Sequence, residues 1–321
     1  MVNPSEFGSP GMAMFGVFDG HGHVGEKCAR FVMAQLPQDL KRIKGSLAGG
    51  SDETVKKELT KTFIEVNDHM HGTAEIDDTL SGTTGVVCLM SGETCWVANV
   101  GDSRCIIVTD AGKTLSAKPL STDQTPYRRD ERARVRKCGA RVLNMDQLEG
   151  LEAIHDDWDM ALGEEVDEGG DPPRIWSQDG AYPGTAFTRS FGDSIAEELG
   201  VNAEPEIVKH VLSAEDQYLV VASDGVWEFL TNKEVVAITK TCASAQEAAC
   251  KLWKASYTQW ITKEVRTDDI TIIVVDVADY FKKFGGGGGA VESGAGANGG
   301  KVLQQGSRRG SLGPSSSGSN K

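Results

Sequence analysis

The segment from Phe15 to His23 combines an acid, a flexible glycine and an imidazole at the end of an apolar run. Asp19 offers carboxylate oxygens, which suit hard metal ions, and Gly20 lets the backbone carbonyl approach a ligand closely. His21 can donate or accept a proton near neutral pH. Because Asp-Gly is also ordinary turn chemistry, this segment alone favours a metal site and a simple strand-ending turn about equally.

Three further apolar runs carry acids at one end. The run WVANVGD stops at Asp102, the run YLVVASDG stops at Asp224, and the acids Asp268 and Asp269 stand before the run ITIIVV. Strands that end at the same edge of a sheet would bring these carboxylates to Asp19. Clustered carboxylates without thiolates or several imidazoles suit Mg²⁺ or Mn²⁺ rather than Zn²⁺. Each acid alone is typical of a turn or a helix cap, so the prediction depends on their joint occurrence.

In number and order, these motifs make the chain resemble the metal-dependent serine/threonine protein phosphatases of the type 2C class. The matching segments, in the family's order, are FDGHG at 18–22, SGTT at 81–84, NVGDSR at 99–104, FTRSFGD at 187–193, ASDGVWE at 222–228 and TDDITIIVV at 267–275. GDPPRIW at 170–176 and YPGTAFTRSFGDSIAEELGV at 182–201 resemble most closely a plant and algal subgroup joined to cyclic-nucleotide-binding and kinase modules. Neither extra module is present in these 321 residues.

The resemblance implies two divalent ions, Mg²⁺ or Mn²⁺, in the active site. Asp19 would bridge both ions and Gly20 would offer its carbonyl, while Asp224 and Asp268 would complete the ligands of one ion. The family has Asp-Asn at the last of these positions. That pattern makes Asp268 the ligand and puts Asp269 at the Asn position.

The resemblance also implies a third, more weakly held ion. Asp102 would bind it together with Asp224. Glu228 stands where the family commonly has an Asp, and it would contribute to the same ion.

Catalysis would then combine the metal-bridging carboxylate of Asp19 with a general acid. By resemblance, His21 would protonate the departing serine or threonine oxygen. Thr84 and Asp193 match family positions that support the site. His23 has the weaker claim of the two histidines, and we interpret it as part of the loop or helix start.

Hydrolysis of phosphoserine and phosphothreonine in proteins by a metal-activated water needs no covalent enzyme intermediate. This mechanism agrees with the absence of a C-x5-R phosphatase motif from the sequence. Another two-metal phosphoesterase, such as a nuclease, is a less favoured class of function, and the acidic composition argues against it.

The sequence departs from the family at its N-terminus. The family's usual first strand pair carries a phosphate-binding Arg and a Glu-Asp pair, and no such residues precede Asp19. We favour truncation over loss of these roles as the explanation. Without them one ion lacks a carboxylate and the substrate phosphate lacks its guanidinium, so activity would be impaired. The alternative function is therefore a degenerate phosphatase that binds phosphoproteins or a kinase.

Composition limits the partners and the compartment. The formal charge of −14 disfavours nucleic acid and anionic membranes as partners. Seven cysteines without a C-x-x-C pair are typical of free thiols in a reducing compartment, so we expect the cytoplasm or the nucleus. We also expect a monomer. No apolar run is long enough to span a bilayer, and we find no secretory signal.

Hydrophobic periodicity predicts an α+β fold, and the resemblance implies a layered α-β-β-α sandwich of two mainly antiparallel sheets flanked by helices. The predicted helices cover 24–36, 51–70, 125–137 and 191–199, with two more opened by capping boxes at Thr231 and Ser244. The predicted strands cover 12–18, 83–89, 94–100, 102–110, 206–211, 217–223 and 270–277. The five arginines of the helix at 125–137 predict a solvated or substrate-steering surface.

We expect a disordered segment at 1–11, one phosphatase domain at 12–284 and a disordered Gly/Ser-rich tail at 285–321. Within the domain, eleven acids and no Lys or Arg between 146 and 171 predict an acidic flap at about 145–175.

The tail contains a candidate phosphorylation site. Arg308 and Arg309 precede Ser311, which matches the preference of basophilic kinases. Phosphate on Ser311 would place an anion beside two cations. Because short basic-serine matches are frequent, coincidence is an equally good explanation.

Overall fold

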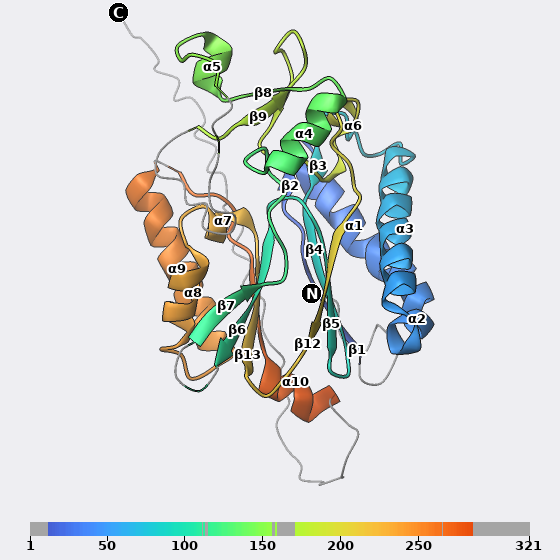
Figure 1. Cartoon of the computed structure of the whole chain (residues 1–321), viewed down its shortest axis with the longest axis vertical. Coiled ribbons are helices and arrows are strands. Elements are labelled where there is room, and N and C mark those ends of the chain that lie inside the picture. The colour runs from blue at the N-terminus through green and yellow to red at the C-terminus, as the bar shows by residue number, and fades with distance from the viewer. Residues whose placement is uncertain are drawn as a thin grey trace, which may run out of the picture.

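The computed structural model describes residues 12–110, 112, 115–155, 158, 171–264 and 266–284. Two four-stranded antiparallel sheets face each other and carry helices on their outer faces (Figure 1). This arrangement confirms the predicted α+β fold of layered sheets between helices.

The first sheet has the strand order β1-β4-β5-β12, formed by Met12–Val17, Gly85–Ser91, Thr94–Val100 and Glu206–Val211. The second has the order β14-β13-β6-β7, formed by Ile272–Asp276, Asp216–Ala222, Arg104–Asp110 and Leu115–Pro119. Every pairing within the two sheets is antiparallel, so neighbouring strands end at alternate edges.

Alternation along each strand builds three apolar layers. On β4, Val86 and Cys88 point between the sheets, whereas Val87 and Leu89 point toward the helices of the outer face. On β13, Leu219 and Val221 likewise point between the sheets, while Val220 and Ala222 pack under the opposite helices. Both faces of these strands are therefore buried, which explains their nearly continuous apolar runs.

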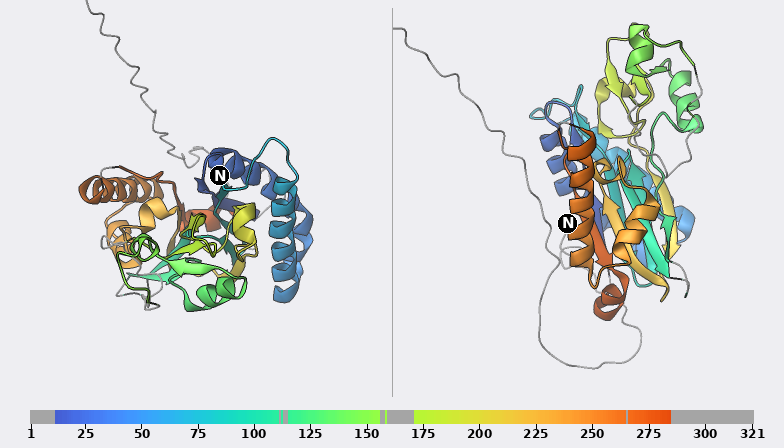
Figure 2. Two further views of the ribbon diagram at one scale, coloured as in Figure 1. Left: turned by 90° about the horizontal axis from the view of Figure 1, so that it is seen from above. Right: turned by 90° about the vertical axis from the view of Figure 1, so that its left-hand side faces the viewer.

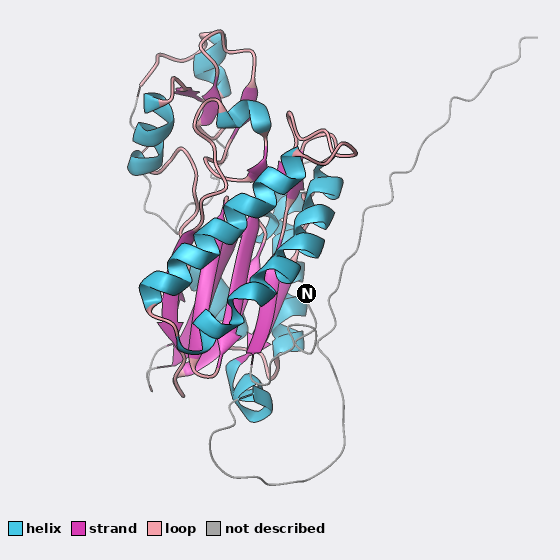
Figure 3. Cartoon of the chain, turned by 90° about the vertical axis from the view of Figure 1, so that its right-hand side faces the viewer, coloured by secondary structure: helices cyan, strands magenta, loops and turns pink. Residues whose placement is uncertain are grey.

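Two helices cover each outer face. On the first sheet lie α1 (Gly25–Leu40) and α3 (Asp52–His71), with η1 (Lys41–Ile43) and α2 (Lys44–Gly49) between them along the chain (Figure 3). On the second lie α8 (Asn232–Thr239) and α9 (Ala245–Lys263), preceded by α7 (Asp224–Trp227). The chain's last described helix is α10 (Val277–Phe284).

Both predicted helix starts are confirmed, and one of the two predicted capping boxes is complete. Thr231 and Glu234 form a complete box at the start of α8. At α9, the Ser244 hydroxyl accepts the Glu247 N–H, but the Glu247 carboxylate accepts the N–H of residue 243 instead of that of Ser244.

Beyond one end of the sandwich lies an insertion (Figure 2). It contains α4 (Arg129–Lys137), α5 (Met145–Glu149) and a sheet of β8 (Arg141–Leu143), β9 (Arg174–Trp176) and β10 (Pro183–Thr185). A second small sheet joins β2 (Gly20–His21), β3 (Gly82–Thr83) and β11 (Phe191–Gly192), and α6 (Ser194–Glu197) follows it.

Several predicted elements differ from the structure in their bounds, among them the helix expected at 24–36, which runs on to Leu40, and the strand expected at 102–110, which begins at Arg104. The helix expected at 125–137 begins only at Arg129, and the helix expected at 191–199 is reduced to Ser194–Glu197. The second loss has a clear cause, because residues 191–192 pair with β3 and Asp193 has a φ of 57°. The strand expected at 270–277 ends at Asp276, where α10 takes over.

The predictions for 1–11, for most of the acidic segment at 156–170 and for the tail with Ser311 lie outside the described residues. None of the described helices combines the length and the apolar composition needed to cross a membrane.

Candidate metal centre and active site

The register of the second sheet places three of the predicted carboxylates at one edge. Ala222 at the end of β13 pairs with Arg104 at the start of β6 and with Ile272 at the start of β14. Asp224 follows the end of β13, and Asp102 and Asp268 precede the starts of β6 and β14. All three therefore lie just beyond the same edge of the sheet.

Asp19 joins this edge from the first sheet. Its backbone N–H donates to Thr84 Oγ1 over 3.2 Å, and its carbonyl accepts the Thr84 N–H over 2.9 Å. The Thr83 hydroxyl donates to the same carbonyl over 2.9 Å. Thr84 Oγ1 also lies 2.8 Å from Ser103 Oγ, next to Asp102. The two sheets are thus connected at the point where their acids meet.

Electrostatics show that these four carboxylates are close to one another. Burial, then repulsion from Asp224, raises the pKa of Asp19 well above its usual value, and Asp268 and Asp102 add to the effect. Burial and Asp268 raise the pKa of Asp224 to about 6. Burial and Asp224 raise the pKa of Asp102 as well. Asp19, Asp102 and Asp224 resist ionisation first because they are buried and then because other carboxylates lie beside them.

A hard cation fits this arrangement. Asp224 Oδ1 is buried and has no hydrogen-bond partner among the described residues. A buried carboxylate oxygen without a partner is costly, and further acids next to it increase the cost. Oxygen donors of this kind are the ligands that Mg²⁺ and Mn²⁺ prefer.

Gly20 and Gly25 bring their backbones into close contact beside Asp19. A Cβ at Gly20 would lie 2.3 Å from the Gly25 carbonyl oxygen, and a Cβ at Gly25 would lie 2.5 Å from the Gly20 carbonyl carbon. No side chain fits at either position without moving the backbone. The turn between β2 and α1 therefore stays narrow, and Gly20 is solvent-exposed.

Backbone contacts connect the Asp224 turn to the segment that carries Asp268. Ser223 Oγ donates to the Asp269 carbonyl and accepts the Thr271 N–H, both over 3.1 Å. A Cβ at Gly225 would lie 2.5 Å from the same Asp269 carbonyl oxygen. The Asp269 N–H donates to Asp268 Oδ1 over 2.7 Å. These contacts fix the two acids relative to each other.

His21 is held by a carboxylate at the edge of the site. Its Nε2 lies 2.6 Å from Asp193 Oδ2, which also accepts the Ser190 hydroxyl over 2.6 Å. The Phe187 ring covers one side of the imidazole, with ring centroids 4.4 Å apart. Asp193 is buried, whereas the His21 side chain is 27% exposed to solvent. The imidazole is therefore oriented and still reachable from solvent.

The remaining predicted residues lie less centrally. The pKa of Asp102 is raised mainly by burial and by Asp224, and Glu228 adds a smaller effect. Glu228 therefore lies near Asp102. Its N–H donates to the Asp224 carbonyl over 2.8 Å, which places it at the end of α7. His23 is exposed in the turn before α1.

A second group of acids is neutralised by arginines. Glu131 accepts hydrogen bonds from Arg189 and Arg134, and Arg128 contacts Glu206 over 2.7 Å. Burial opposes ionisation of Glu131, but the bonds from Arg189 and Arg134 outweigh it and lower its pKa to about 2. Cations already compensate these acids, so they do not form a metal site. The predicted solvated surface is wrong for Arg128 and Arg132, which are buried.

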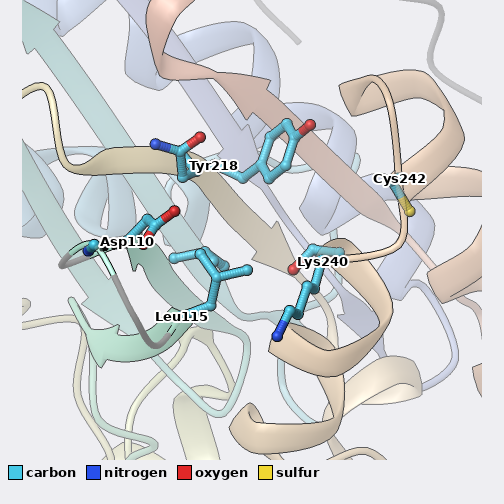
Figure 4. Close-up of a pocket in the computed structure, with 9 residues that line it drawn as sticks. Asp110, Leu115, Tyr218, Lys240 and Cys242 are labelled. Carbon is cyan, nitrogen blue, oxygen red and sulfur yellow. Dashed lines mark hydrogen bonds between the residues drawn. The ribbon is translucent and has the colours of Figure 1, made fainter.

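The cavity in Figure 4, of about 390 Å³, lies away from the carboxylates. It is lined by Asp110, Leu115, Tyr218, Lys240 and Cys242 among others. Asp110 ends the strand that begins beside Asp102, so roughly 20 Å of β6 separates the two, at about 3.3 Å per residue. The cavity is therefore not the candidate active site.

Sequence reasoning missed residues that act through long-range contacts. Asp123 adds to the raised pKa values of Asp102 and Asp224, both due mainly to burial, and it pairs with Arg104 over 2.6 Å in the interior. Ser190 was missed although it lies inside a matched motif. Asn67 was missed because its contact to Gly192 spans 125 residues. No local pattern marks such a pair.

The family model for protein phosphatase 2C matches residues 5–264 of the chain. The probable protein phosphatase 2C 35 of Arabidopsis thaliana is 45% identical over 270 residues, covering 84% of this chain and 75% of the relative. The probable protein phosphatase 2C 72 of the same plant is 32% identical over 278 residues, covering 83% and 77%.

A solved serine-threonine phosphatase 2C from Toxoplasma gondii superimposes with a TM-score of 0.64 at 17% identity, covering 85% of this chain and 87% of that one, and so shares the fold. The family model and the plant relatives lead to one conclusion: the chain belongs to the protein phosphatase 2C family.

Proposed function

We propose that the four converging carboxylates form the metal centre of a serine/threonine protein phosphatase. The observation that carries the proposal is the buried, partnerless Asp224 Oδ1 among acids that raise one another's pKa values. The oriented His21 beside this centre supports hydrolysis over simple metal storage.

Asp19, Gly20, Asp224 and Asp268 are the proposed ligands of two Mg²⁺ or Mn²⁺ ions. When bound, these ions supply an activated water and charge neutralisation for the phosphoryl oxygens. The neutralisation is needed here, because the chain carries a formal charge of −14 and its substrate is an anion. Asp102 and Glu228 are the proposed additional ligands of a third ion, shared with Asp224.

His21 is the proposed general acid. With Nε2 occupied by Asp193, Nδ1 is the atom left to donate a proton to the departing serine or threonine oxygen. The Asp193 carboxylate orients the imidazole, and the Ser190 hydroxyl keeps that carboxylate in place. Thr84 acts indirectly, since it binds both the backbone N–H and the backbone carbonyl of Asp19.

The degenerate binding module is not favoured. A module that only binds phosphoproteins or a kinase would not need carboxylates assembled at the cost of mutual repulsion. Family membership points the same way.

The test is phosphatase activity on a phosphopeptide and on p-nitrophenyl phosphate with Mn²⁺ or Mg²⁺. We expect turnover that a chelator abolishes and that Asp224→Asn lowers by at least about 100-fold. The matched control is Asp110→Asn, which changes an exposed carboxylate at the opposite end of the same sheet and should leave activity intact. Unchanged turnover of the Asp224 variant at saturating Mn²⁺ would show that the ligand assignment is wrong.

Calorimetric titration of the metal-free protein counts the ions directly. We expect two tight Mn²⁺ sites and a third, weaker one that Asp102→Asn removes selectively. An absence of tight binding in a folded protein would support the binding module instead.

The natural partners are proposed to be phosphorylated proteins. We propose in addition that a basophilic kinase modifies Ser311, which mass spectrometry after incubation with such a kinase would detect. The resemblance to the plant and algal subgroup with cyclic-nucleotide-binding and kinase modules remains a proposal, supported by the segments at 170–176 and 182–201. Seven free cysteines support a reducing compartment, the cytoplasm or nucleus, and we propose a monomer.

A further inference from the structure

We infer that Asn67 and His71, on the last turns of α3, are positioning residues for the His21–Asp193 pair. Neither residue belongs to a matched motif, and neither touches the metal-binding carboxylates in any contact described above. The inference rests on the proposed role of His21 as general acid. It starts from the backbone of the turn that carries Asp193.

That turn has an unusual backbone conformation. Gly192 has a φ of 81° and Asp193 a φ of 57°, and Asp193 is the one residue other than glycine with positive φ in the described part of the chain. A residue with a side chain adopts this conformation only when surrounding contacts hold it there. The Asp193 carboxylate can reach His21 Nε2 because of this conformation, so whatever fixes the turn also fixes the imidazole.

Asn67 fixes the turn from the side of α3. Its Oδ1 accepts the Gly192 N–H over 2.8 Å, and its Nδ2 donates to Glu197 Oε1 over 2.7 Å. Asn67 is only 5% exposed, so water cannot replace it easily at Gly192. One buried amide therefore spans the turn, from the residue before Asp193 to the helix that follows it.

His71 fixes the same turn through the segment on its other side. Its Nδ1 lies 2.6 Å from Asp78 Oδ2, and the Asp78 carbonyl accepts the Ser194 N–H over 3.1 Å. Its Nε2 lies 3.2 Å from Glu197 Oε2. A hydrogen bond with Glu197, followed by the charges of Glu197 and Asp78, raises the pKa of His71 to about 9 against the opposing effect of burial.

The protonation state of His71 decides which of its contacts form. Protonated His71 donates to the carboxylates of Asp78 and Glu197. The Asn67 amide then donates to Glu197 Oε1. In the neutral form, Nε2 accepts from Asn67 Nδ2, 2.9 Å away. The bond to Asp78 persists in both forms, so the segment before β3 stays attached to α3. The Asp193 N–H donates to the Ser81 carbonyl at the end of this segment over 3.0 Å.

The test separates general-acid catalysis from all other contributions by the choice of leaving group. A serine alkoxide needs protonation as it departs, whereas p-nitrophenolate is a good leaving group without it. We expect Asn67→Ala to lower kcat for a phosphoserine peptide by roughly 10- to 100-fold. We expect kcat for p-nitrophenyl phosphate to change less than about threefold, with Mn²⁺ affinity unchanged, because the metal centre is intact.

A rescue variant controls for simple loss of packing. In Asn67→Asp combined with Glu197→Gln, an aspartate oxygen still accepts the Gly192 N–H, and the new amide donates to it from the other side. This double variant should recover at least half of the phosphopeptide activity. His71→Gln supplies a second variant for the case in which Asn67→Ala does not fold, and it should show the same dependence on the leaving group.

His21→Asn distinguishes failure of the inference from failure of the proposed function. If His21→Asn itself affects both substrates equally, His21 is not the general acid. If His21→Asn discriminates between the substrates but Asn67→Ala and His71→Gln affect them equally or not at all, the two residues do not position the pair. A double variant that folds and stays as slow as Asn67→Ala also overturns the inference.

Discussion

The crowding of carboxylates predicts that the metal-free protein becomes more stable when one of them is removed. The change is Asp224→Asn. With a pKa raised from 3.8 to about 6 by burial and Asp268, Asp224 makes the folded state bind a proton more tightly than the unfolded chain does. The stability linked to this proton is therefore fully present below about pH 4 and is lost as the pH rises through 6.

The size of the effect follows from the pKa difference. At about 1.4 kcal/mol per pH unit, ionising Asp224 above pH 7 costs the folded state up to about 3 kcal/mol. An asparagine cannot ionise, and its amide can donate to Asp19, so the variant avoids this cost. For a domain of this size, such a gain raises Tm by roughly 5 °C.

Thermal unfolding at two pH values, with and without metal, checks the prediction. With EDTA at pH 7.5 the variant should melt above the parent protein, and near pH 4 the difference should nearly vanish. With saturating Mn²⁺ the order should reverse, because ligand binding stabilises the parent protein and the variant has lost a ligand. Asp110→Asn should change neither curve. An Asp224 variant that melts below the parent in EDTA at pH 7.5 would refute the claim of repulsion at this site.

Three further predictions use the same physical reasoning. The raised pKa of His71, due first to its hydrogen bond with Glu197, predicts stability that is complete below about pH 6.5 and is lost toward pH 9, so Tm of the parent but not of His71→Gln should fall over that range. Glu131→Gln removes the buried carboxylate that the half-buried Arg134 and Arg189 share, and it should lower the free energy of unfolding by about 1–3 kcal/mol, measured in urea. Thr84→Val removes the acceptor of the Asp19 N–H and should weaken Mn²⁺ binding by about 10- to 100-fold in calorimetry.

The positions of the acids could be predicted from the sequence because each follows from a local rule. A strand buried on both faces reads as a continuous apolar run, and the first acid after it marks the strand's end. Asp102 and Asp224 were found in this way, and the register of β6 against β13 then places them at the same edge. The helix starts at Ser51 and Thr231 follow from capping residues in the same local sense.

The parts that could not be predicted depend on contacts between distant segments. Residues 191–199 have a helical pattern, but pairing with β3 and the positive φ of Asp193 delay the helix to Ser194. Arg132 looks like a solvent-facing arginine, yet it is buried and donates to the backbone carbonyl of Pro126 over 2.9 Å. In both cases the tertiary environment overrides the local pattern, and no window of sequence contains the partner.

The separation of the apolar layers from the carboxylate site explains how an acidic protein could bind an anionic substrate. The three apolar layers lie away from the site and fix the strand ends, so the four carboxylates cannot move apart to relieve their repulsion. If all four are ionised they carry four negative charges, which two divalent cations would balance. With that balance a phosphate dianion could approach, so we expect metal binding to be a condition for substrate binding as well as for catalysis. The repulsion that destabilises the metal-free site is thus the source of its affinity for the ions.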